Sequence, residues 1–580
     1  MVDIKSFPFE SESKSAIKEL KLDAVKVGES WPVVYVINDE KEVYVGQTTN
    51  ILNRTSQHLD NPKKSKLTTI QIMSKSDFNV SVALDLESYL IKHMGSDGKF
   101  RLMNGNHGIK DHNYFEREKY SDTFEDIWNQ LIGLGLAKQS IEEIENTELF
   151  KYSPYKALGE EQIQIEYDIF KKLAKRKEDG NDITVVVRGG AGTGKTILAV
   201  YLMKLFADVI AQPLYLSADE EDEEYTSDFI AAAECIGDIE KIGMIIPQKP
   251  LRESLKDVFD SVNNLNSDMV MDVYKALEES KTHGIFDLLI VDEGHRLKTR
   301  KNGGNFNLRD NMQFKKWCDY FQLDDKEVSE LDLLMKCSRN LIVFRDDKQT
   351  VRAADIGSEQ FSKTVSSAKT KVSDFNLSTQ WRCKGGKDYT DYVRSIMTCT
   401  APEFLEVLNY DFKLYEDVDR MSRDIKELEK KWELCRVAAG YAWKWVTKGK
   451  PAAKFPTLFD IEIDNHKYRW NSTTNNWIYT KNAINEIGCI HTVQGFDLNY
   501  LGVIIGEDIR YDTEKKCIVA DASNYYDSLG ITGLANKPEE LRDYLVNIYT
   551  TLMTRGIRGT YVYVCDPALR EYMAQFIPKA

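Results

Sequence analysis

The chain has 580 residues, too many for a single hydrophobic core, and its length predicts roughly three to four domains. With 42% hydrophobic and 29% charged residues, the composition is that of a globular protein and excludes disorder over the whole chain. The formal net charge of −15 argues against a protein that coats nucleic acid without specificity, although it leaves room for a local basic groove.

A short hairpin is the first predicted element. Residues 33–58 read VVYVINDEKEVYVGQTTNILNRTSQH, in which two apolar runs each carry a tyrosine, Tyr35 and Tyr44. Arg54 and His58 follow at positions i and i+4, which places both on one face of the helix expected there. Tyrosines in such hairpins are often half-buried cross-strand residues, so the pattern by itself leaves a purely structural role open.

Taken in order, these residues resemble the GIY-YIG nuclease family. VVY (33–35) stands where the family has GIY, and YVG (44–46) stands where it has YIG. Farther on, LESYLIKHM contains Glu87, which matches the family's metal ligand, and RLMNGNHG contains Asn104, which matches its asparagine. The resemblance covers about the first 110 residues and departs from the family at Val33, where a glycine is usual.

The resemblance implies the chemistry of phosphodiester cleavage. Tyr35 or Tyr44 would act as general base toward water, and Arg54 would hold the scissile phosphate with paired donors. Glu87 would hold one Mg²⁺ ion that polarises the phosphate. His58 would orient the water or a tyrosine, and the amide of the matched asparagine would hold a loop or the phosphate.

The remainder of the chain predicts helices and parallel strands. Apolar residues three and four apart indicate a helical connector at 121–150, after a small domain at 1–120. From there on, near-continuous apolar runs such as ITVVVRGG, FDLLIVDE and TYVYVCD end in glycine or acid, as strands covered on both faces do. The fold class is therefore predicted to be α/β, with two RecA-like parallel-sheet lobes at 151–370 and 371–580.

A phosphate-binding loop is the clearest motif. GGAGTGKT satisfies GxxxxGK[ST] and lies between a predicted strand and a predicted helix, so that backbone N–H groups and the helix N-terminus face one anion. Lys195 would neutralise the β- and γ-phosphates of ATP, and Thr196 would ligate Mg²⁺. The residues expected to contact the nucleotide are Gly189, Gly190, Ala191, Gly192, Thr193, Gly194, Lys195 and Thr196.

A second nucleotide motif supplies carboxylates. The run FDLLIVDEGH is an apolar strand that delivers Asp292 toward Mg²⁺ and Glu293 toward the γ-phosphate, where it would activate water. A strand that ends in DE is common, but together with the phosphate loop it predicts an ATP-hydrolysing site. ATP and Mg²⁺ are the expected cofactors.

With these motifs the chain resembles superfamily-one helicases and the neighbouring Schlafen-like group of bacterial P-loop proteins, from about residue 158 to residue 561. LGEEQ looks like the motif that reads adenine and places Gln162 there, and FRDDKQ looks like the sensor motif with Gln349 facing the γ-phosphate. STQWRC and LMTRGIRG match the motifs that supply arginine fingers, Arg382 and Arg555. Cations on one lobe that meet a phosphate loop on the other would couple hydrolysis to lobe closure.

Two departures bear on the second lobe and on DNA binding. The coupling motif HTVQGFD has Asp497 where glutamate is usual, and we find no match for the first-lobe motifs that grip single-stranded DNA. The acidic run DEEDEE at 219–224 lies where one of them is expected. The sequence therefore supports ATP hydrolysis more directly than strand separation.

Residues 427–445, ELEKKWELCRVAAGYAWKW, predict a long amphipathic helix that braces the second lobe or forms a partner surface. We expect its aromatic residues to pack in a core, although stacking on bases is the alternative.

The leading hypothesis is an ATP-dependent endonuclease in which the helicase-like ATPase drives or gates cleavage of DNA, in a role such as defence against foreign DNA. The alternatives are an ATP-switched nuclease without translocation and a nucleic-acid docking protein with a degenerate nuclease fold. RNA as substrate, a homo-oligomer and a partner protein all remain open.

The nine cysteines are scattered without a CxxC pair, a distribution that disfavours zinc and suits reduced thiols. No stretch resembles a signal peptide or a membrane span, so a cytoplasmic protein without a membrane partner is expected.

Overall fold

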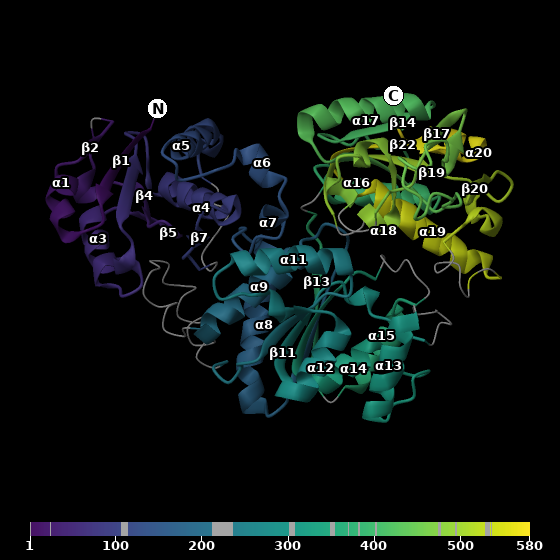
Figure 1. The fold of residues 1–580 in the computed structure, drawn as a ribbon, viewed down its shortest axis with the longest axis horizontal. Helices are drawn as coiled ribbons and strands as arrows, with labels where there is room; N and C mark the ends of the chain where they lie inside the picture. Colours follow the sequence, from purple (N-terminus) through teal and green to yellow (C-terminus); the bar gives the residue numbers. More distant parts are fainter. Residues whose placement is uncertain are drawn as a thin grey trace. The chain divides into compact units, whose positions relative to one another are not determined.

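The computed structural model describes most of the chain, and its ribbon is drawn in Figure 1. The described residues are 2–23, 25–105, 114–211, 236–300, 308–347, 354–368, 370–380, 383–400, 403–473, 477–493, 496–527, 534 and 536–580. They form two compact units. The first comprises Met1–Asp179, Thr196–Ile242 and Glu253–Val270, and the second comprises Gly180–Lys195, Gly243–Arg252 and Met271–Ala580.

The N-terminal region is built on a five-stranded sheet of order β1-β6-β4-β5-β7. The predicted hairpin is confirmed, because β4 and β5 pair antiparallel with Tyr35 opposite Gly46 and Ile37 opposite Tyr44. The alternate residues Val33, Tyr35 and Ile37 enter a core with α1–α3, and α4 packs against β4 and β5. The elements are β1 (Asp3–Pro8), α1 (Lys14–Lys18), β2 (Lys21–Leu22), β3 (Val25–Lys26), α2 (Val27–Ser30), β4 (Val33–Asn38), β5 (Glu42–Thr48), α3 (Ile51–Asp60), β6 (Thr69–Ser74), α4 (Val80–Asp97) and β7 (Arg101–Leu102).

Short helices follow in the connector. They are α5 (Ser121–Gly133), α6 (Ile141–Glu145) and α7 (Glu148–Lys151). In α5 the buried residues Phe124, Ile127, Trp128 and Leu131 are spaced i, i+3, i+4 and i+7, so the apolar periodicity forms the buried face of the helix.

The first large sheet has the order β10-β9-β11-β12-β8-β13, and its pairs β11–β12, β12–β8 and β8–β13 are parallel. Because β13 begins at Lys371, this sheet extends past residue 370, where the lobes were expected to divide. Its strands are β8 (Ile183–Gly189), β9 (Ile242–Ile245), β10 (Val270–Met271), β11 (Phe286–Val291), β12 (Ser338–Arg345) and β13 (Lys371–Leu377). The helices of this region are α8 (Glu160–Asp179), α9 (Lys195–Ala211), α11 (Lys249–Ser261), α12 (Val273–His283), α13 (Leu308–Phe321), α14 (Glu330–Cys337) and α15 (Ser358–Ser367).

The second large sheet is parallel, with the order β14-β22-β19-β15-β18. Alternate residues of β22 enter different cores, Val562 with α16 and α19, and Tyr561 with α17. Both faces of the sheet are therefore covered, as the apolar runs predict. Its elements are β14 (Asp411–Tyr415), β15 (Cys435–Ala439), β18 (Ile487–Cys489), β19 (Leu498–Ile505), β22 (Gly556–Val564), α16 (Gly386–Met397), α17 (Val418–Trp432), α18 (Ile490–Val493), α19 (Pro538–Met553) and α20 (Pro567–Met573). Two small ribbons pair β16 (Ile461–Ile463) with β17 (His466–Tyr468) and β20 (Ile509–Asp512) with β21 (Cys517–Ala520).

The prediction of a long helix over residues 427–445 is wrong. Helix α17 ends at Trp432, and the next two residues, Glu433 and Leu434, adopt φ values of 53° and 45° that turn the chain. The following CRVAA run is β15, paired on both sides, because burial between β18 and β19 outweighs its helical pattern. The aromatic residues beyond it do pack in a core, where Tyr441 stacks on Trp470 with ring centroids 5.5 Å apart.

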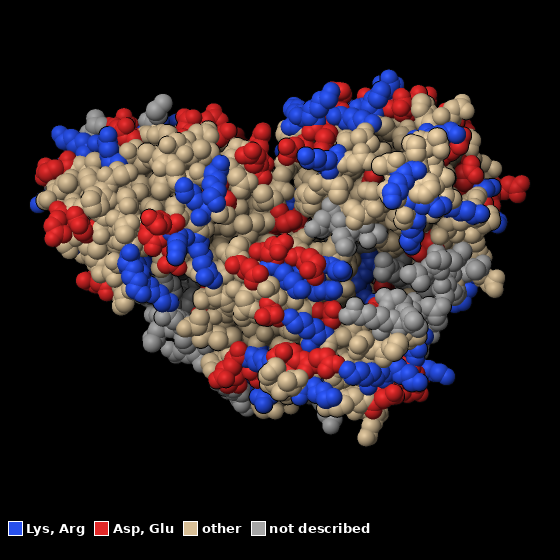
Figure 2. Space-filling model, viewed as in Figure 1, with Lys and Arg blue, Asp and Glu red and all other residues tan. Residues whose placement is uncertain are grey.

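Both signs of charge are interspersed over the described residues on the face shown in Figure 2. In the part of the chain that the structure describes, no helix combines the length and apolar character needed to cross a membrane.

Candidate active sites

The hairpin glycine is required by close packing of the tyrosine across from it. An added Cβ at Gly46 would lie 2.3 Å from the hydroxyl of Tyr35, which is fully buried. The valine that stands where the family has its first glycine, Val33, is buried in the same core. The departure at Val33 is therefore accommodated by packing.

The Tyr35 hydroxyl is the centre of a polar cluster between β4 and α3. It lies 2.8 Å from Nε2 of His58 and accepts a hydrogen bond of 3.3 Å from Nε of Arg54. The i, i+4 spacing predicted from the sequence thus directs two side chains of one helix at one phenol. In this arrangement the imidazole is placed to take the phenol proton, and the guanidinium stabilises the oxygen that is left.

Tyr44 adds a second phenol, and Lys64 adds a cation that the sequence reasoning missed. The Tyr44 ring lies edge-on to the His58 ring, with centroids 5.0 Å apart. The Lys64 ammonium lies 3.7 Å from the centroid of the Tyr44 ring, and the lysine side chain is fully buried. Nothing in the run NPKKSK distinguishes this lysine from its neighbours, because only the turn after α3 carries it inward.

Glu87 and Asn104 lie in different structural environments, Glu87 on helix α4 and Asn104 in the loop next to β5. Glu87 is half-buried on α4, the helix that packs against β4 and β5. A single carboxylate suits a Mg²⁺ ion that takes its remaining ligands from water and phosphate, so the residue fits the proposed metal. Asn104 accepts from the Val45 N–H at 2.9 Å and donates to the Val45 carbonyl at 2.8 Å, so its amide holds the loop onto β5. It is a positioning residue beside Tyr44.

The phosphate loop has the shape that an anion site needs. Gly192 and Gly194 have φ values of 77° and 81°, which side chains rarely adopt. The Lys195 ammonium donates to the carbonyl oxygens of Gly189 and Gly190 at 2.9 and 2.7 Å, so it is held against the loop at the start of α9. Its positive charge and the helix N-terminus together favour a bound phosphate.

The two motif carboxylates lie at the end of β11. Asp292 is fully buried, and its backbone N–H donates to the Ile245 carbonyl at 3.0 Å. Glu293 has a strained φ of 53°, and its carboxylate lies 3.2 Å from Nε2 of His295. Burial works against its charge, but His295 and Lys195 hold the pKa of Glu293 below its ordinary value. The Glu293 side chain therefore stays ionised.

Of the other residues predicted for the nucleotide site, the structure describes Gln162 and Arg555. Gln162 is buried, and its side-chain oxygen accepts from the Gly159 N–H at 3.0 Å, which gives it a capping role at the start of α8. Arg555 is buried between α19 and β22. Gln349 and Arg382 lie outside the described residues, as do residues 494–495 of the coupling motif HTVQGFD and the acidic run 219–224.

Helix α9 also contacts the region around α4. Tyr155 is buried against α4, since a Cβ added at Gly95 would lie 2.7 Å from its ring. Lys204 of α9 lies 5.9 Å from the Tyr155 ring centroid and forms an ion pair with Asp208. Beside it, Asn263 donates to the Leu102 carbonyl of β7 at 2.9 Å. Helix α9, which begins at the phosphate loop, is thus connected to α4, the helix that carries Glu87, through the side chain of Tyr155.

Comparisons with known proteins find family matches over the same two regions of the chain. A model of the family described as Schlafen group 3, DNA/RNA helicase domain, matches residues 183–566, more than half of the chain. A model of the GIY-YIG catalytic domain matches residues 32–101. The uncharacterized protein YPL245W of Saccharomyces cerevisiae is 27% identical over 415 residues, which cover 67% of this chain and 82% of the yeast protein.

Among solved structures, domain III of the Thermotoga maritima replication initiation protein DnaA matches 50% of this chain and 90% of its own. Its sequence identity is 12% and its TM-score is 0.20. The family matches are in the order expected from the motifs, with the nuclease domain ahead of the helicase-like domain. The chain therefore belongs to the Schlafen group 3 DNA/RNA helicase-domain family and carries a GIY-YIG nuclease domain in front of that domain.

Proposed function

We propose that this protein is an ATP-dependent endonuclease, in which ATP bound and hydrolysed with Mg²⁺ at the phosphate loop gates a Mg²⁺-dependent nuclease that cuts DNA. The observation that carries the proposal is the Tyr35 hydroxyl, held by both His58 and Arg54 in a chain that also has a phosphate loop. We place its role in defence against foreign DNA, because ATP control would confine cleavage to molecules that engage the ATPase domain.

The nuclease step follows from the cluster around Tyr35. Its proton passes to Nε2 of His58, 2.8 Å away, and the phenol oxygen then accepts a proton from the attacking water. Arg54 offsets the charge that develops on the phosphate. Glu87 would hold Mg²⁺, which, when bound, polarises the phosphate and stabilises the leaving oxygen. Lys64 holds the Tyr44 ring beside this cluster, because its ammonium lies 3.7 Å from the ring centroid.

At the nucleotide site, Lys195 would contact the β- and γ-phosphates, and Thr196 and Asp292 would hold Mg²⁺, which would neutralise part of the phosphate charge. The ionised Glu293 carboxylate would orient the water that attacks the γ-phosphate. Arg382 and Arg555 are proposed to supply the cations that offset transition-state charge.

Gating is supported by the packing of α9. This helix begins at Lys195 and reaches the Tyr155 side chain through Lys204, and Tyr155 packs against α4 at Gly95. A change in the position of α9 on ATP binding would therefore be transmitted through Tyr155 to α4, the helix that carries Glu87. This contact favours the switch over continuous translocation as the means of control.

The cleavage assay uses the full chain with duplex, single-stranded and branched DNA, in the presence of ATP, ADP or no nucleotide. We expect cutting that requires Mg²⁺, is stimulated by ATP, and falls at least about 100-fold in Tyr35→Phe and Glu87→Gln. Tyr320→Phe, a change at an exposed tyrosine, is the matched control. Cleavage that continues at the wild-type rate in both site variants would remove the nuclease assignment.

The gating assay compares Tyr155→Leu with the wild type. We expect Tyr155→Leu to retain ATP hydrolysis and basal cutting but to lose the stimulation by ATP, since the contact with Gly95 is weakened. Stimulation that stays equal to wild type would show that control does not pass through this contact. ATPase activity that rises with single-stranded DNA would instead favour a motor.

A further inference from the structure

Two exposed patches of opposite charge lie in the region that holds the second large sheet, outside both candidate active sites. The first is the loop at 444–459, which runs from β15 toward the β16–β17 ribbon and reads KWVTKGKPAAKFPTLF. It carries four lysines and no acidic residue, although the chain as a whole has a net charge of −15. We call this segment the basic loop.

The basic loop is tied down by hydrogen bonds to its backbone. Near its two ends, the Asp460 carboxylate accepts from the Thr447 N–H at 2.7 Å. In its middle, the Arg469 guanidinium donates to the carbonyl oxygens of Lys450 and Phe455 at 2.7 and 2.8 Å. A loop that is closed at its base and fixed in its middle is a preformed surface, so a partner would bind it at a small cost in conformational entropy.

The outer face of the basic loop is apolar as well as positive. Val446, Phe455 and Phe459 are 41%, 44% and 37% exposed, so these side chains are not part of the core beneath the loop. Val446 and Phe459 flank the hydrogen-bonded pair Thr447 and Asp460, which brings them together at the base. Within the described residues, none of the four lysines forms an ion pair with a carboxylate. Exposed apolar side chains gathered in this way mark interaction sites.

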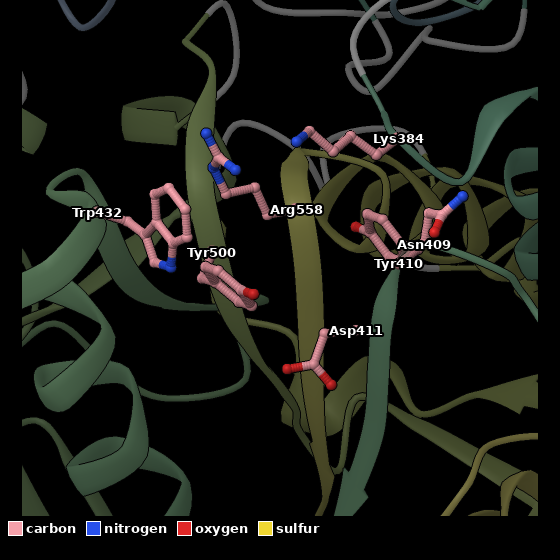
Figure 3. Close-up of a pocket in the computed structure, with 7 residues that line it drawn as sticks. All are labelled: Lys384, Asn409, Tyr410, Asp411, Trp432, Tyr500 and Arg558. Carbon is pink, nitrogen blue, oxygen red and sulfur yellow. The ribbon is translucent and has the colours of Figure 1, made fainter. Parts of the chain in front are cut away.

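The second patch is the segment 403–408, EFLEVL, which lies between α16 and β14. It leads toward Tyr410, which lines the 370 Å³ pocket drawn in Figure 3 together with Lys384, Arg558 and other residues. The segment itself lies outside that lining. It carries two glutamates and no basic residue, and we call it the acidic segment.

The acidic segment is anchored on one side and apolar on the other. Val407 packs against the core beside α16 and α19, and the Leu405 N–H donates to the Tyr392 hydroxyl at 3.1 Å. With these two anchors in place, the side chains of Phe404, Leu405 and Leu408 remain 55%, 41% and 73% exposed. Three large apolar side chains within five residues thus form a patch that no part of the described chain covers.

Each patch carries the charge that the other lacks. Glu403 and Glu406 are exposed and, within the described residues, form no ion pair with a basic side chain. Because the apolar side chains of both patches are exposed, the two patches do not cover each other within one chain. The chain itself therefore supplies a surface that complements the basic loop, and a second copy can present it.

We propose that the basic loop of one copy of this chain docks against the acidic segment of a second copy. The contact would cover apolar side chains on both copies and set lysines against glutamates, so packing and charge select the same partner. At a salt concentration of about 0.15 M the Debye length is about 8 Å, so charges that face each other across the contact outweigh the repulsion between two copies of net charge −15. The association requires neither nucleotide nor nucleic acid and is independent of the proposed function.

The test is sedimentation velocity of the full chain over about 1–50 μM in about 0.15 M salt, without nucleotide or DNA. The wild type should show a mass that rises with concentration. The loop variant, Lys450→Glu with Lys454→Glu, and the segment variant, Glu403→Lys with Glu406→Lys, should each self-associate at least about tenfold more weakly, because like charges then face each other. All four side chains are exposed, so thermal unfolding of both variants should match wild type.

Mixing the two variants gives the sharpest result. The reversed loop of one variant then meets the reversed segment of the other, and the unchanged loop meets the unchanged segment, so the mixture should associate within about threefold of wild type. Recovery on mixing also requires that both variants are folded. Lys387→Glu with Lys426→Glu is the matched control, since both lysines are exposed and lie outside the two patches, and it should associate like wild type.

Three outcomes would overturn the proposal. The first is a wild type that stays monomeric over the whole concentration range. The second is self-association that persists unchanged in both variants, because the interface would then lie elsewhere. The third is a pair of monomeric variants that do not associate when mixed, since the loop and the segment would then not contact each other. Leu408→Asp tests the apolar part separately and should weaken association about tenfold, whereas unchanged association would contradict that contact.

Discussion

Replacing Gly46 by alanine tests the nuclease cluster most directly. The added Cβ would lie 2.3 Å from the Tyr35 hydroxyl, whereas ordinary contacts begin at 3.4 Å. Because Gly46 lies within a paired strand and Tyr35 is fully buried, the phenol must move by about 1 Å. A movement of that size breaks the 2.8 Å contact with His58, which is already close to the ordinary hydrogen-bond length.

The expected cost has two parts. Overpacking of this kind lowers the free energy of unfolding of the nuclease domain by about 1–3 kcal/mol. Loss of the aligned proton acceptor lowers the cleavage rate on the order of 10²- to 10⁴-fold, because general acid–base catalysis depends on that geometry. Both effects arise from one methyl group that touches no substrate.

The assay measures plasmid nicking and phosphate release from ATP on the same preparation. Gly46→Ala should lose nicking and keep ATP hydrolysis. Gly133→Ala is the matched control, since its Cβ would meet nothing within 4 Å. If Gly46→Ala folds like wild type and nicks DNA at the wild-type rate, the Tyr35–His58 contact is not part of catalysis.

Three further predictions concern single side chains. Lys195→Ala should lower ATP turnover at least about 100-fold, because the loop loses the cation that meets the phosphates, and phosphate release at the wild-type rate would contradict the site. Lys64→Met keeps the packing but removes the charge 3.7 Å from the centroid of the Tyr44 ring, so cleavage should slow on the order of tenfold because the cation–π contact that holds the ring is lost. Cleavage at the wild-type rate would assign Lys64 to packing alone. Burial raises the pKa of Glu166 from 4.5 to about 8, so the folded protein retains a proton that the unfolded chain loses, and stability falls from about pH 4.5 until about pH 8. Glu166→Gln should therefore leave Tm unchanged at pH 4.5 and raise it increasingly toward pH 8, by up to a few kcal/mol in stability, whereas an equal shift at every pH would exclude titration of Glu166 as the cause.

Much of the nuclease and nucleotide sites could be predicted because their residues are close in sequence. The glycines of the phosphate loop, Lys195 and the helix after them form one contiguous segment, so their relation is local. Tyr35, Arg54 and His58 span one hairpin and one helix, and the i, i+4 spacing alone brings the last two to one face.

Other residues could not be predicted because distant contacts decide their roles. Lys64 becomes important only when the turn after α3 delivers it to the Tyr44 ring. Asn104 was matched by type, but its role in holding β5 depends on the Val45 backbone. The prediction of a helix over 427–445 failed because residues 435–439 pair with β18 on one side and β19 on the other. This pairing and burial outweigh the helical spacing of the segment.

By itself the sequence determined the family, the order of the domains and the identities of the phosphate loop and of the phenol–arginine–histidine set, since each is encoded by short-range spacing. Only the tertiary structure decided that Trp432 ends a helix, that Lys384 and Arg558 share a pocket, and that Tyr155 joins α9 to α4. These contacts join residues far apart in the chain. Their formation depends on how the sheets bring strand and helix ends together, and no local pattern records it.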